Sequence, residues 1–173
     1  MNPLIAKTSA SIYQDVASPI GRLRLIASGD ELTGIWFEHG RDARRENPGL
    51  VPGNSAVLER AKAQLEEYFR GERREFDLPL APSGTEFQRR VWRRLSEIEY
   101  GTTTTYGALA HELGNPNASR AVGLANGSNP IPIVIPCHRV IGANGALTGF
   151  GGGLPIKSAL LDLERASRQP RLF

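Results

Sequence analysis

The chain holds one cysteine, Cys137, which lies in the run PCHRV at residues 136–140. A single thiol can form neither an internal disulfide nor a two-cysteine metal site, so it is either a lone nucleophile or a small buried apolar side chain. His138 follows directly, and histidine is the usual partner that favours a thiolate. Adjacent side chains in extended chain nevertheless point to opposite faces. The Cys-His pair alone therefore favours an inert buried thiol, and the rest of the chain must decide.

Composition restricts the class of protein. The chain has 173 residues, of which 40% are hydrophobic and 23% are charged, as in a soluble globular protein with one domain or two small ones. No apolar run approaches the roughly 20 residues that span a bilayer, and the N-terminus lacks the apolar stretch of a signal peptide. These features and the single cysteine predict a reducing, cytoplasmic location without membrane contact.

Charge is distributed unevenly along the chain. Residues 1–84 hold 11 Lys and Arg against 12 Asp and Glu, whereas residues 85–173 hold 10 against 6, a net charge of +4. The basic half also contains the cysteine. This excess permits a polyanionic partner such as nucleic acid, although an excess of four charges is often only a solvated surface.

The first half of the chain predicts an antiparallel sheet and one helix. Three runs rich in β-branched or large apolar residues lie at residues 12–18, 23–28 and 32–38. Residues 39–53 are polar, contain Gly and Pro, and predict a loop. A helix is then expected from residue 54 or 55 to about residue 70, where Gly71 ends it.

Residues 72–84 contain two prolines and Gly84 and predict a linker. Residues 1–80 are therefore expected to form one domain, and residues 85–173 a second. The expected fold class is α/β of the α+β kind, with a small antiparallel sheet and a helix first and a mostly helical domain after it.

The second domain begins with a clear helix signal. Thr85 and Gln88 form a capping box, and the helix that they open is expected to run to about residue 98. Two further helical patterns cover residues 105–113 and 118–126 and are joined by a turn at 114–116. Two short helices with a tight turn predict a helix-turn-helix, although many such pairs bind no DNA.

Small side chains fill the helix expected at 118–126. Arg120 is its only charged residue, and Leu124 is expected to face inward. Small residues allow either a close partner or close packing inside the protein, and the sequence leaves both open. The glycines of GFGGG at 149–153 indicate a backbone close to something flat or with positive φ, but they form no phosphate loop. A last helix is expected over 156–166.

Four segments of the second half resemble one family. They are SRAVG at 119–123, Asn-Pro at 129–130, IPCHRVI at 135–141, and GGL at 152–154 with Lys157. Together they resemble the O6-alkylguanine-DNA alkyltransferases, also called methylated-DNA–protein-cysteine methyltransferases. The resemblance is dense over residues 85–164, and the first half is similar in length and in β-then-helix order. It implies an RNase H-like first domain and favours a reactive Cys137 over an inert one.

The resemblance implies five catalytic residues. Cys137 is implied to accept the alkyl group, and His138 to draw the thiol proton through a bridging water. Glu164 is implied to hold His138, and Asn129 to order the turn that aims the cysteine. Tyr106 is implied to lie near the lesion and to supply a proton to the departing guanine. These roles suit the reaction, because thiolate is a soft nucleophile and guanine leaves better when it is protonated.

The resemblance also implies a DNA surface and a lid. Arg120 is implied to enter the duplex and fill the gap left by a guanine flipped out of it, which costs a few kcal/mol of stacking. The positions implied to line the DNA are Gly107, Asn115, Ala121 and Gly123. Phe150 and Gly152 are implied to belong to a lid over the guanine pocket. Phe150 stands where relatives often carry Tyr, and Gly151 where a Ser can occur, so one hydroxyl contact is lost there.

The implied activity is repair of O6-alkylguanine, and of O4-alkylthymine, in double-stranded DNA by irreversible, stoichiometric transfer to Cys137. No cofactor, metal site or obligate protein partner is expected, and the protein is expected to be a monomer. One cysteine and three scattered histidines exclude a cysteine-rich zinc site. Two alternatives stay open: a lesion sensor that transfers poorly, and a Cys-His hydrolase in which Glu164 orients the histidine.

Overall fold

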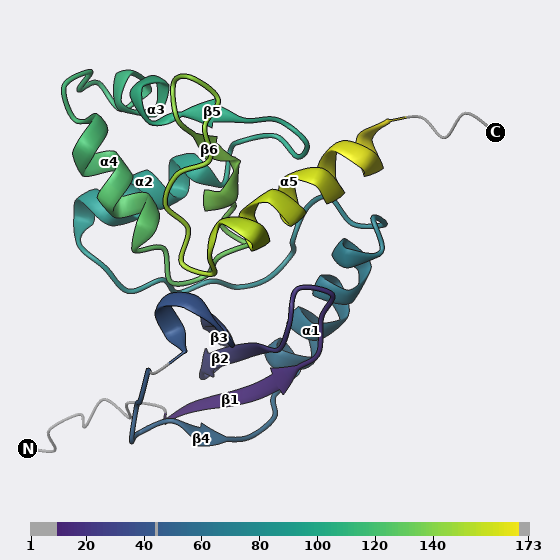
Figure 1. Ribbon diagram of the computed structural model, residues 1–173. Helices are drawn as coiled ribbons and strands as arrows, with labels where there is room; N and C mark the ends of the chain where they lie inside the picture. Colours follow the sequence, from purple (N-terminus) through teal and green to yellow (C-terminus); the bar gives the residue numbers. More distant parts are fainter. Residues whose placement is uncertain (1–9, 44, 170–173) are drawn as a thin grey trace, which may run out of the picture.

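The computed structural model describes residues 10–43 and 45–169 and has two parts, which Figure 1 shows side by side. A small sheet and helix α1 (Ala56–Phe69) form the N-terminal part, in purple and blue. The C-terminal part, in teal to yellow, contains α2 (Glu86–Leu95), α3 (Tyr106–Glu112), α4 (Ser119–Gly127) and α5 (Leu154–Arg168). The expected fold class, with a sheet and helix followed by a mostly helical part, is confirmed.

The sheet has four strands in the order β3-β2-β1-β4. Strands β1 (Ser11–Val16), β2 (Leu23–Ser28) and β3 (Glu31–Phe37) pair antiparallel, as the apolar runs predict. A bulge between Ile26 and Ala27 shifts the register between β2 and β3. Most side chains of β2 are buried, because this central strand lies beneath α1.

The predicted loop over residues 39–53 is wrong in two places. It contains one turn of 3₁₀ helix, η1 (Gly40–Asp42), and a two-residue strand, β4 (Val51–Pro52), which pairs parallel to β1. The Gly53 amide also donates to the carbonyl of Tyr13 at 3.0 Å. Elements this short have no periodicity that a sequence can reveal, and a partner distant in the chain satisfies their backbone groups.

Helix α1 begins and ends as its sequence predicts. The Ser55 side chain accepts a hydrogen bond from the Leu58 amide, which caps the helix. Gly71, with φ of +74°, follows the last turn, a conformation that glycine adopts at little cost. The buried face packs on the sheet and consists of Val57, Leu58, Ala61, Gln64, Leu65 and Tyr68. The last of these side chains reaches beyond the sheet toward the C-terminal part.

The predicted linker, residues 72–84, follows the edge of the sheet for part of its length. The Leu32 amide donates to the carbonyl of Pro79 at 2.8 Å, and the Ala81 amide donates to the carbonyl of Leu32 at 2.9 Å. These bonds occupy backbone groups that the edge strand β3 would otherwise expose. The division into residues 1–80 and 85–173 stays a prediction.

Helices α2, α3 and α4 pack together in the C-terminal part. The predicted capping box of Thr85 and Gln88 is present at the start of α2. The Trp92 indole donates to the carbonyl of Ala125 at 2.8 Å and fixes how α4 is rotated against α2. The inward orientation expected for Leu124 is wrong: its side chain is 73% exposed. The rotation set by Trp92 buries Val122 and Ala125 and leaves Leu124 outside.

Short elements connect these helices to the cysteine. Strand β5 (Thr104–Thr105) pairs parallel to β6 (Val140–Ile141), directly after the 3₁₀ turn η2 (Cys137–Arg139). All residues from 131 to 140 are buried, and α5 contacts η2. Within the described ranges 10–43 and 45–169, no helix is long and apolar enough to cross a membrane.

Candidate active site

A tightly held turn places Cys137. The Asn129 side chain donates to the carbonyl of Ile135 at 2.7 Å and accepts from the Ile131 amide at 3.0 Å, so it closes the turn from both sides. Ile133 has φ of +74°, which costs a β-branched residue about 1–3 kcal/mol. The Cys137 amide donates to the carbonyl of Ile135 at 2.8 Å. The turn-ordering contacts expected of Asn129 are therefore present.

Cys137 is buried, with 4% of the residue exposed. Burial raises its pKa, while the Asn129 side chain and the positive charges of Lys157 and Arg41 act to lower it. The net effect is a raised pKa, so at neutral pH the group is a thiol. A nucleophilic Cys137 thus needs a base that accepts its proton when the substrate is bound.

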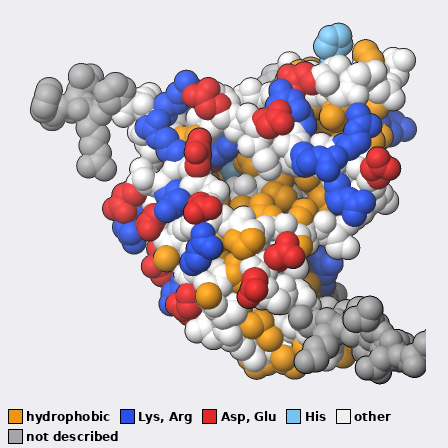
Figure 2. All heavy atoms as spheres, turned by 180° about the vertical axis from the view of Figure 1, so that it is seen from behind, with side chains coloured by type: hydrophobic (Ala, Val, Ile, Leu, Met, Phe, Trp, Pro, Cys, Tyr) orange, Lys and Arg blue, Asp and Glu red, His pale blue; other side chains and the backbone are white. Residues whose placement is uncertain are grey.

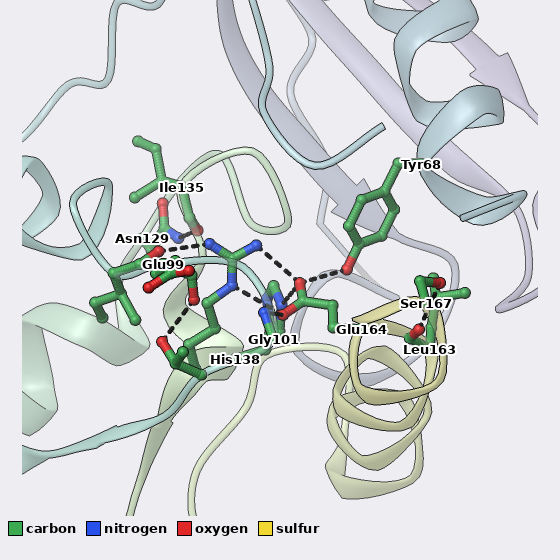
Figure 3. Close-up of polar contacts among 12 residues, drawn as sticks. Tyr68, Glu99, Gly101, Asn129, Ile135, His138, Leu163, Glu164 and Ser167 are labelled. Carbon is green, nitrogen blue, oxygen red and sulfur yellow. Dashed lines mark hydrogen bonds and ion pairs between the residues drawn. The ribbon is translucent and has the colours of Figure 1, made fainter. Parts of the chain in front are cut away.

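His138 and Glu164 form a buried pair next to the cysteine, both with no exposed side-chain surface. His138 Nε2 lies 2.6 Å from Glu164 Oε1, and Figure 3 shows the two side chains together. Burial would raise the pKa of Glu164, but hydrogen bonds from His138 and Arg139 lower it to about 2. Burial lowers the pKa of His138, although the hydrogen bond to Glu164 and the negative charge of that carboxylate act to raise it.

The tautomer of His138 follows from these charges. Glu164 is a carboxylate at neutral pH and can only accept, so the proton of neutral His138 is on Nε2. His138 Nδ1 is buried and has no hydrogen-bond partner among the described residues. This nitrogen therefore keeps a free lone pair, which is the state that a general base requires.

A segment of the N-terminal part contacts the loop of residues 142–153, which contains Phe150 and Gly152 and is called the lid. The Arg41 amide donates to the carbonyl of Gly151 at 2.9 Å, and the Phe37 and Phe150 rings have centroids 5.4 Å apart. The Arg41 guanidinium donates to the carbonyl of Gly127. A side chain at Gly40 would place its Cβ 2.3 Å from the Gly151 carbonyl oxygen. The lid and the sheet are therefore in direct contact.

The cavity beside the thiol is closed. Its lining includes Cys137, Asn129, Phe150, Arg41 and Asn126, and its volume is about 10 Å³, room for about one water molecule. The predicted residues Cys137, Asn129 and Phe150 are thus brought together, and Gly152 is buried against the Phe37 ring. A guanine ring needs far more space than this cavity provides.

Tyr106 lies at the other end of the lid. Its hydroxyl donates to the carbonyl of Thr148 at 3.2 Å, and the Thr148 hydroxyl lies at the same distance. A Cβ added at Gly123 would lie 3.7 Å from the Tyr106 ring, at ordinary van der Waals contact, so α4 passes beside this ring. Tyr106 therefore connects α3, α4 and the lid, although it does not line the closed cavity.

The remaining predicted residues lie outside the cavity on α3, α4 and the turn between them. Gly107, Asn115, Arg120 and Ala121 are all exposed. Figure 2 shows Lys and Arg side chains gathered over the region of α2, whose Arg89, Arg90 and Arg93 are exposed. The structure thus divides the predicted residues into a buried group around Cys137 and an exposed group on α3 and α4.

Sequence reasoning assigned no role to several residues of the buried group. Lys157 has no exposed surface, and its ammonium donates to the carbonyls of Val140 at 2.6 Å and Thr148 at 2.7 Å. Tyr68 and Arg139 contact Glu164, and Arg41 contacts the lid. A lysine among the apolar positions of α5 is a signal that can be found in the sequence. The contacts of Tyr68, Arg139 and Arg41 depend on tertiary packing and leave no such signal. No cluster of three metal-ligating side chains occurs in the described part of the chain.

Two family models match the chain and together cover both parts of the fold. Residues 11–82 match the ribonuclease-like domain of 6-O-methylguanine DNA methyltransferase. Residues 86–166 match the DNA binding domain of 6-O-methylguanine DNA methyltransferase. The fold and the buried cysteine site therefore define a protein of the 6-O-methylguanine DNA methyltransferase class.

Individual relatives agree with the family models. The methylated-DNA–protein-cysteine methyltransferase of Methanosarcina acetivorans is 52% identical over 152 residues, which is 88% of this chain and 97% of that protein. The Mycobacterium tuberculosis protein of the same name is 49% identical over 91% of this chain and 94% of its own length. The chain belongs to the methylated-DNA–protein-cysteine methyltransferase family, and the resemblance found in the sequence is confirmed.

Solved structures give the same result for the fold. The Mycobacterium tuberculosis OGT in complex with DNA superposes with a TM-score of 0.84 at 47% identity, over 90% of this chain and 94% of that one. The O6-methylguanine methyltransferase of the same organism superposes with a TM-score of 0.83 at 46% identity, over 93% of this chain and 96% of that one. Both parts of this chain therefore share the arrangement found in these proteins.

Proposed function

We propose that the protein repairs O6-alkylguanine in double-stranded DNA by moving the alkyl group irreversibly to Cys137. The observation that carries the proposal is the pairing of a buried thiol with a neutral histidine, whose Nε2 is held by Glu164 and whose Nδ1 is free. The family membership of the chain supports the same reaction. O4-alkylthymine carries an alkyl ether of the same kind and is a second substrate.

The chemical step needs no cofactor. The Cys137 thiol gives its proton through a bridging water to His138, and Glu164 stabilises the imidazolium. The thiolate attacks the alkyl carbon, so the sulfur–carbon bond forms as the carbon–O6 bond breaks. The electron pair leaves with the guanine, which takes a proton from the Tyr106 hydroxyl. Asn129 keeps the cysteine in place throughout.

DNA binding is proposed for the exposed helices. Helices α3 and α4 form a helix-turn-helix, and Gly107, Asn115, Ala121 and Gly123 line the duplex. Arg120 fills the gap left by the flipped base, which must leave the stack because the thiol is buried. Phe150 and Gly152 move with the lid to admit the base. The exposed arginines of α2 and the exposed Leu124 favour this surface.

The product of the step is a thioether. Cys137 is the chain's only cysteine, so no second thiol of the chain can regenerate it, and each molecule is expected to repair one lesion. The test is an intact-mass measurement after exposure to a duplex with one O6-methylguanine. We expect the mass of one methyl group, located on Cys137, and no further reaction when more lesions are added.

The same experiment separates the alternatives. A lesion sensor would bind the duplex and leave the protein mass unchanged. A Cys-His hydrolase would turn over an ester or amide many times and carry no lasting methyl group. Repair of many lesions by each molecule would contradict the irreversible mechanism. A monomer and a cytoplasmic location complete the proposal and rest on the sequence.

A further inference from the structure

The carboxylate of Glu164 accepts more hydrogen bonds than its pairing with His138 requires. Oε1 accepts from the Tyr68 hydroxyl at 2.8 Å, His138 Nε2 at 2.6 Å and an Arg139 nitrogen at 2.9 Å. Oε2 accepts from Arg139 Nε at 2.9 Å and the Gly101 amide at 3.2 Å. Four of these five donors belong to the C-terminal part. The fifth, Tyr68, comes from α1, and Figure 3 shows its hydroxyl directed at this carboxylate.

Tyr68 acts as a donor here. Its side chain has no exposed surface, and its ring packs against those of Phe69, Phe76 and Tyr100 at centroid distances of 5.4, 5.5 and 6.2 Å. Burial, and then the negative charge of Glu164, raise the pKa of the phenol, so the hydroxyl keeps its proton. Because the carboxylate carries no proton at neutral pH, the bond runs from Tyr68 to Glu164.

Tyr68 and His138 compete for one oxygen atom. A hydrogen bond to a carboxylate stabilises its charged form and reduces its attraction for other protons. The hydrogen bond from Tyr68 therefore reduces the extent to which Glu164 stabilises the doubly protonated, cationic form of His138. It also fixes the plane of the carboxylate, and with it the orientation of the imidazole that bonds to the same oxygen.

We propose that Tyr68 is a positioning residue of the alkyl transfer, which acts through Glu164 on His138 and makes the N-terminal part a component of the active site. The inference rests on the proposed roles of Cys137, His138 and Glu164. It assigns a catalytic purpose to a contact between residues 96 positions apart in the chain.

Loss of the Tyr68 hydroxyl should change the pH dependence of the transfer. The titratable and charged groups around the His138–Glu164 pair are Tyr68 from α1, Arg139 from η2 and Lys157 from α5. Tyr100, from the segment before β5, lies against Tyr68 and Arg139. Without the Tyr68 hydroxyl, Glu164 attracts a proton on His138 more strongly. Protonated His138 has no free Nδ1 lone pair, so the base is lost at a higher pH than in the wild-type protein.

The test compares Tyr68→Phe with a matched control, Tyr100→Phe. Both changes remove one hydroxyl from a buried tyrosine of the same aromatic cluster. The Tyr100 hydroxyl has no hydrogen-bond partner among the described residues, and its ring also lies beside Arg139. Single-turnover transfer from an O6-methylguanine duplex is measured at saturating protein between pH 5 and about pH 9, a range that spans the usual pKa values of histidine and cysteine.

We expect Tyr68→Phe to slow transfer about tenfold at neutral pH, below the loss typical of a direct acid–base group. In the plot of transfer rate against pH, the fall in rate at low pH should begin at a higher pH for Tyr68→Phe. Tyr100→Phe should show the same plot as the wild-type protein. In a Glu164→Gln background, Tyr68→Phe should cause no further loss, because the hydroxyl acts through that carboxylate. A transfer rate that falls by the same factor at every pH, or equal effects of both tyrosine changes, would overturn the inference. Tyr68 would then only hold the N-terminal and C-terminal parts together.

Two further measurements keep the test decisive. If Tyr68→Phe unfolds, nitrogen NMR of the three labelled histidines in the wild-type protein reports the state of His138. A His138 that is already protonated at neutral pH would contradict the inference. A wild-type protein that gains no methyl group would instead refute the proposed function, which the Tyr68 comparison presupposes.

Discussion

Two regions flank Cys137 and are held in different ways: the buried cluster around Glu164 on its inner side and the lid on its outer side. On the inner side, Tyr68, His138, Arg139 and Glu164 are buried, and five hydrogen bonds converge on one carboxylate. On the outer side, the lid is rich in glycine and rests on contacts from Arg41, Phe37, Tyr106 and Lys157. The contacts of the inner side converge on one buried carboxylate, whereas those of the outer side are spread along a loop.

This difference matches what each side has to do. A general base must keep its orientation through the reaction, so its supports are buried and satisfied. In the proposed reaction a flipped base has to pass the outer side, where a cavity of about 10 Å³ is too small to receive it. The proposal therefore requires the lid contacts to break in each reaction, while those of the inner side persist. Four substitutions test this comparison.

The largest effect is expected on the inner side. Arg139→Leu removes two charge-assisted bonds and leaves the Glu164 carboxylate buried without its cation. Removing one partner of a buried ion pair costs about 3–5 kcal/mol, so urea unfolding should show a loss of this size. The control is Arg94→Leu, whose pairs with Glu97 and Glu112 are partly exposed, and a loss below about 1 kcal/mol is expected there. Equal losses would show that the inner side is no more tightly held than the surface.

The second effect concerns rate. Glu164→Gln keeps the shape of the side chain but removes the charge that stabilises protonated His138. Single-turnover transfer should slow by one to two orders of magnitude, within the range of acid–base groups. Glu97→Gln, an exposed change, serves as the control. An unchanged rate would make Glu164 a structural residue of the helix end.

The third effect belongs to the outer surface. Arg120→Ala should slow repair of a lesion in duplex DNA about tenfold more than repair in a single strand, where no stack must be opened. Both rates are measured at saturating protein, so that differences in affinity do not contribute. Arg93→Ala, on the exposed face of α2, should slow neither rate under these conditions. Equal fractional losses on the two substrates would leave Arg120 as an ordinary phosphate contact.

The smallest effect, a few-fold change in the reactivity of Cys137, concerns the lid. Two opposite contributions are expected: easier access to the thiol and a higher pKa of the thiol. Arg41→Ala frees the lid, so Cys137 should react faster with a bulky maleimide at high pH. The lost positive charge had acted to lower the pKa of Cys137. The pKa therefore rises, and the reaction should require a higher pH than in the wild-type protein. Arg45→Ala is the control, because Arg45 also pairs with Asp42 but belongs to no wall of the cavity. A rate profile identical to the control would show that Arg41 does not hold the lid.

Local patterns in the sequence predicted much of the fold. The strands at the apolar runs, the Ser55 cap and the Thr85–Gln88 capping box all form as expected, because each signal lies in residues only a few positions apart. The two-residue strand β4 and the turn η1 escaped prediction, since their hydrogen bonds come from distant chain. Leu124 was assigned to the wrong face because the rotation of α4 is set by Trp92, 33 positions from its acceptor.

The sequence by itself indicated the chemistry through a resemblance: one cysteine followed by a histidine in a specific motif, with Asn129 and Glu164 at positions to which that resemblance assigns roles. The tertiary structure decided how that chemistry is controlled. Tyr68 reaches Glu164 from the N-terminal part, and Arg41 reaches the lid from the same side. Neither contact leaves a periodic or local signal. Each exists only because the packing of the sheet and α1 against the C-terminal part brings residues together that lie about 90 or more positions apart.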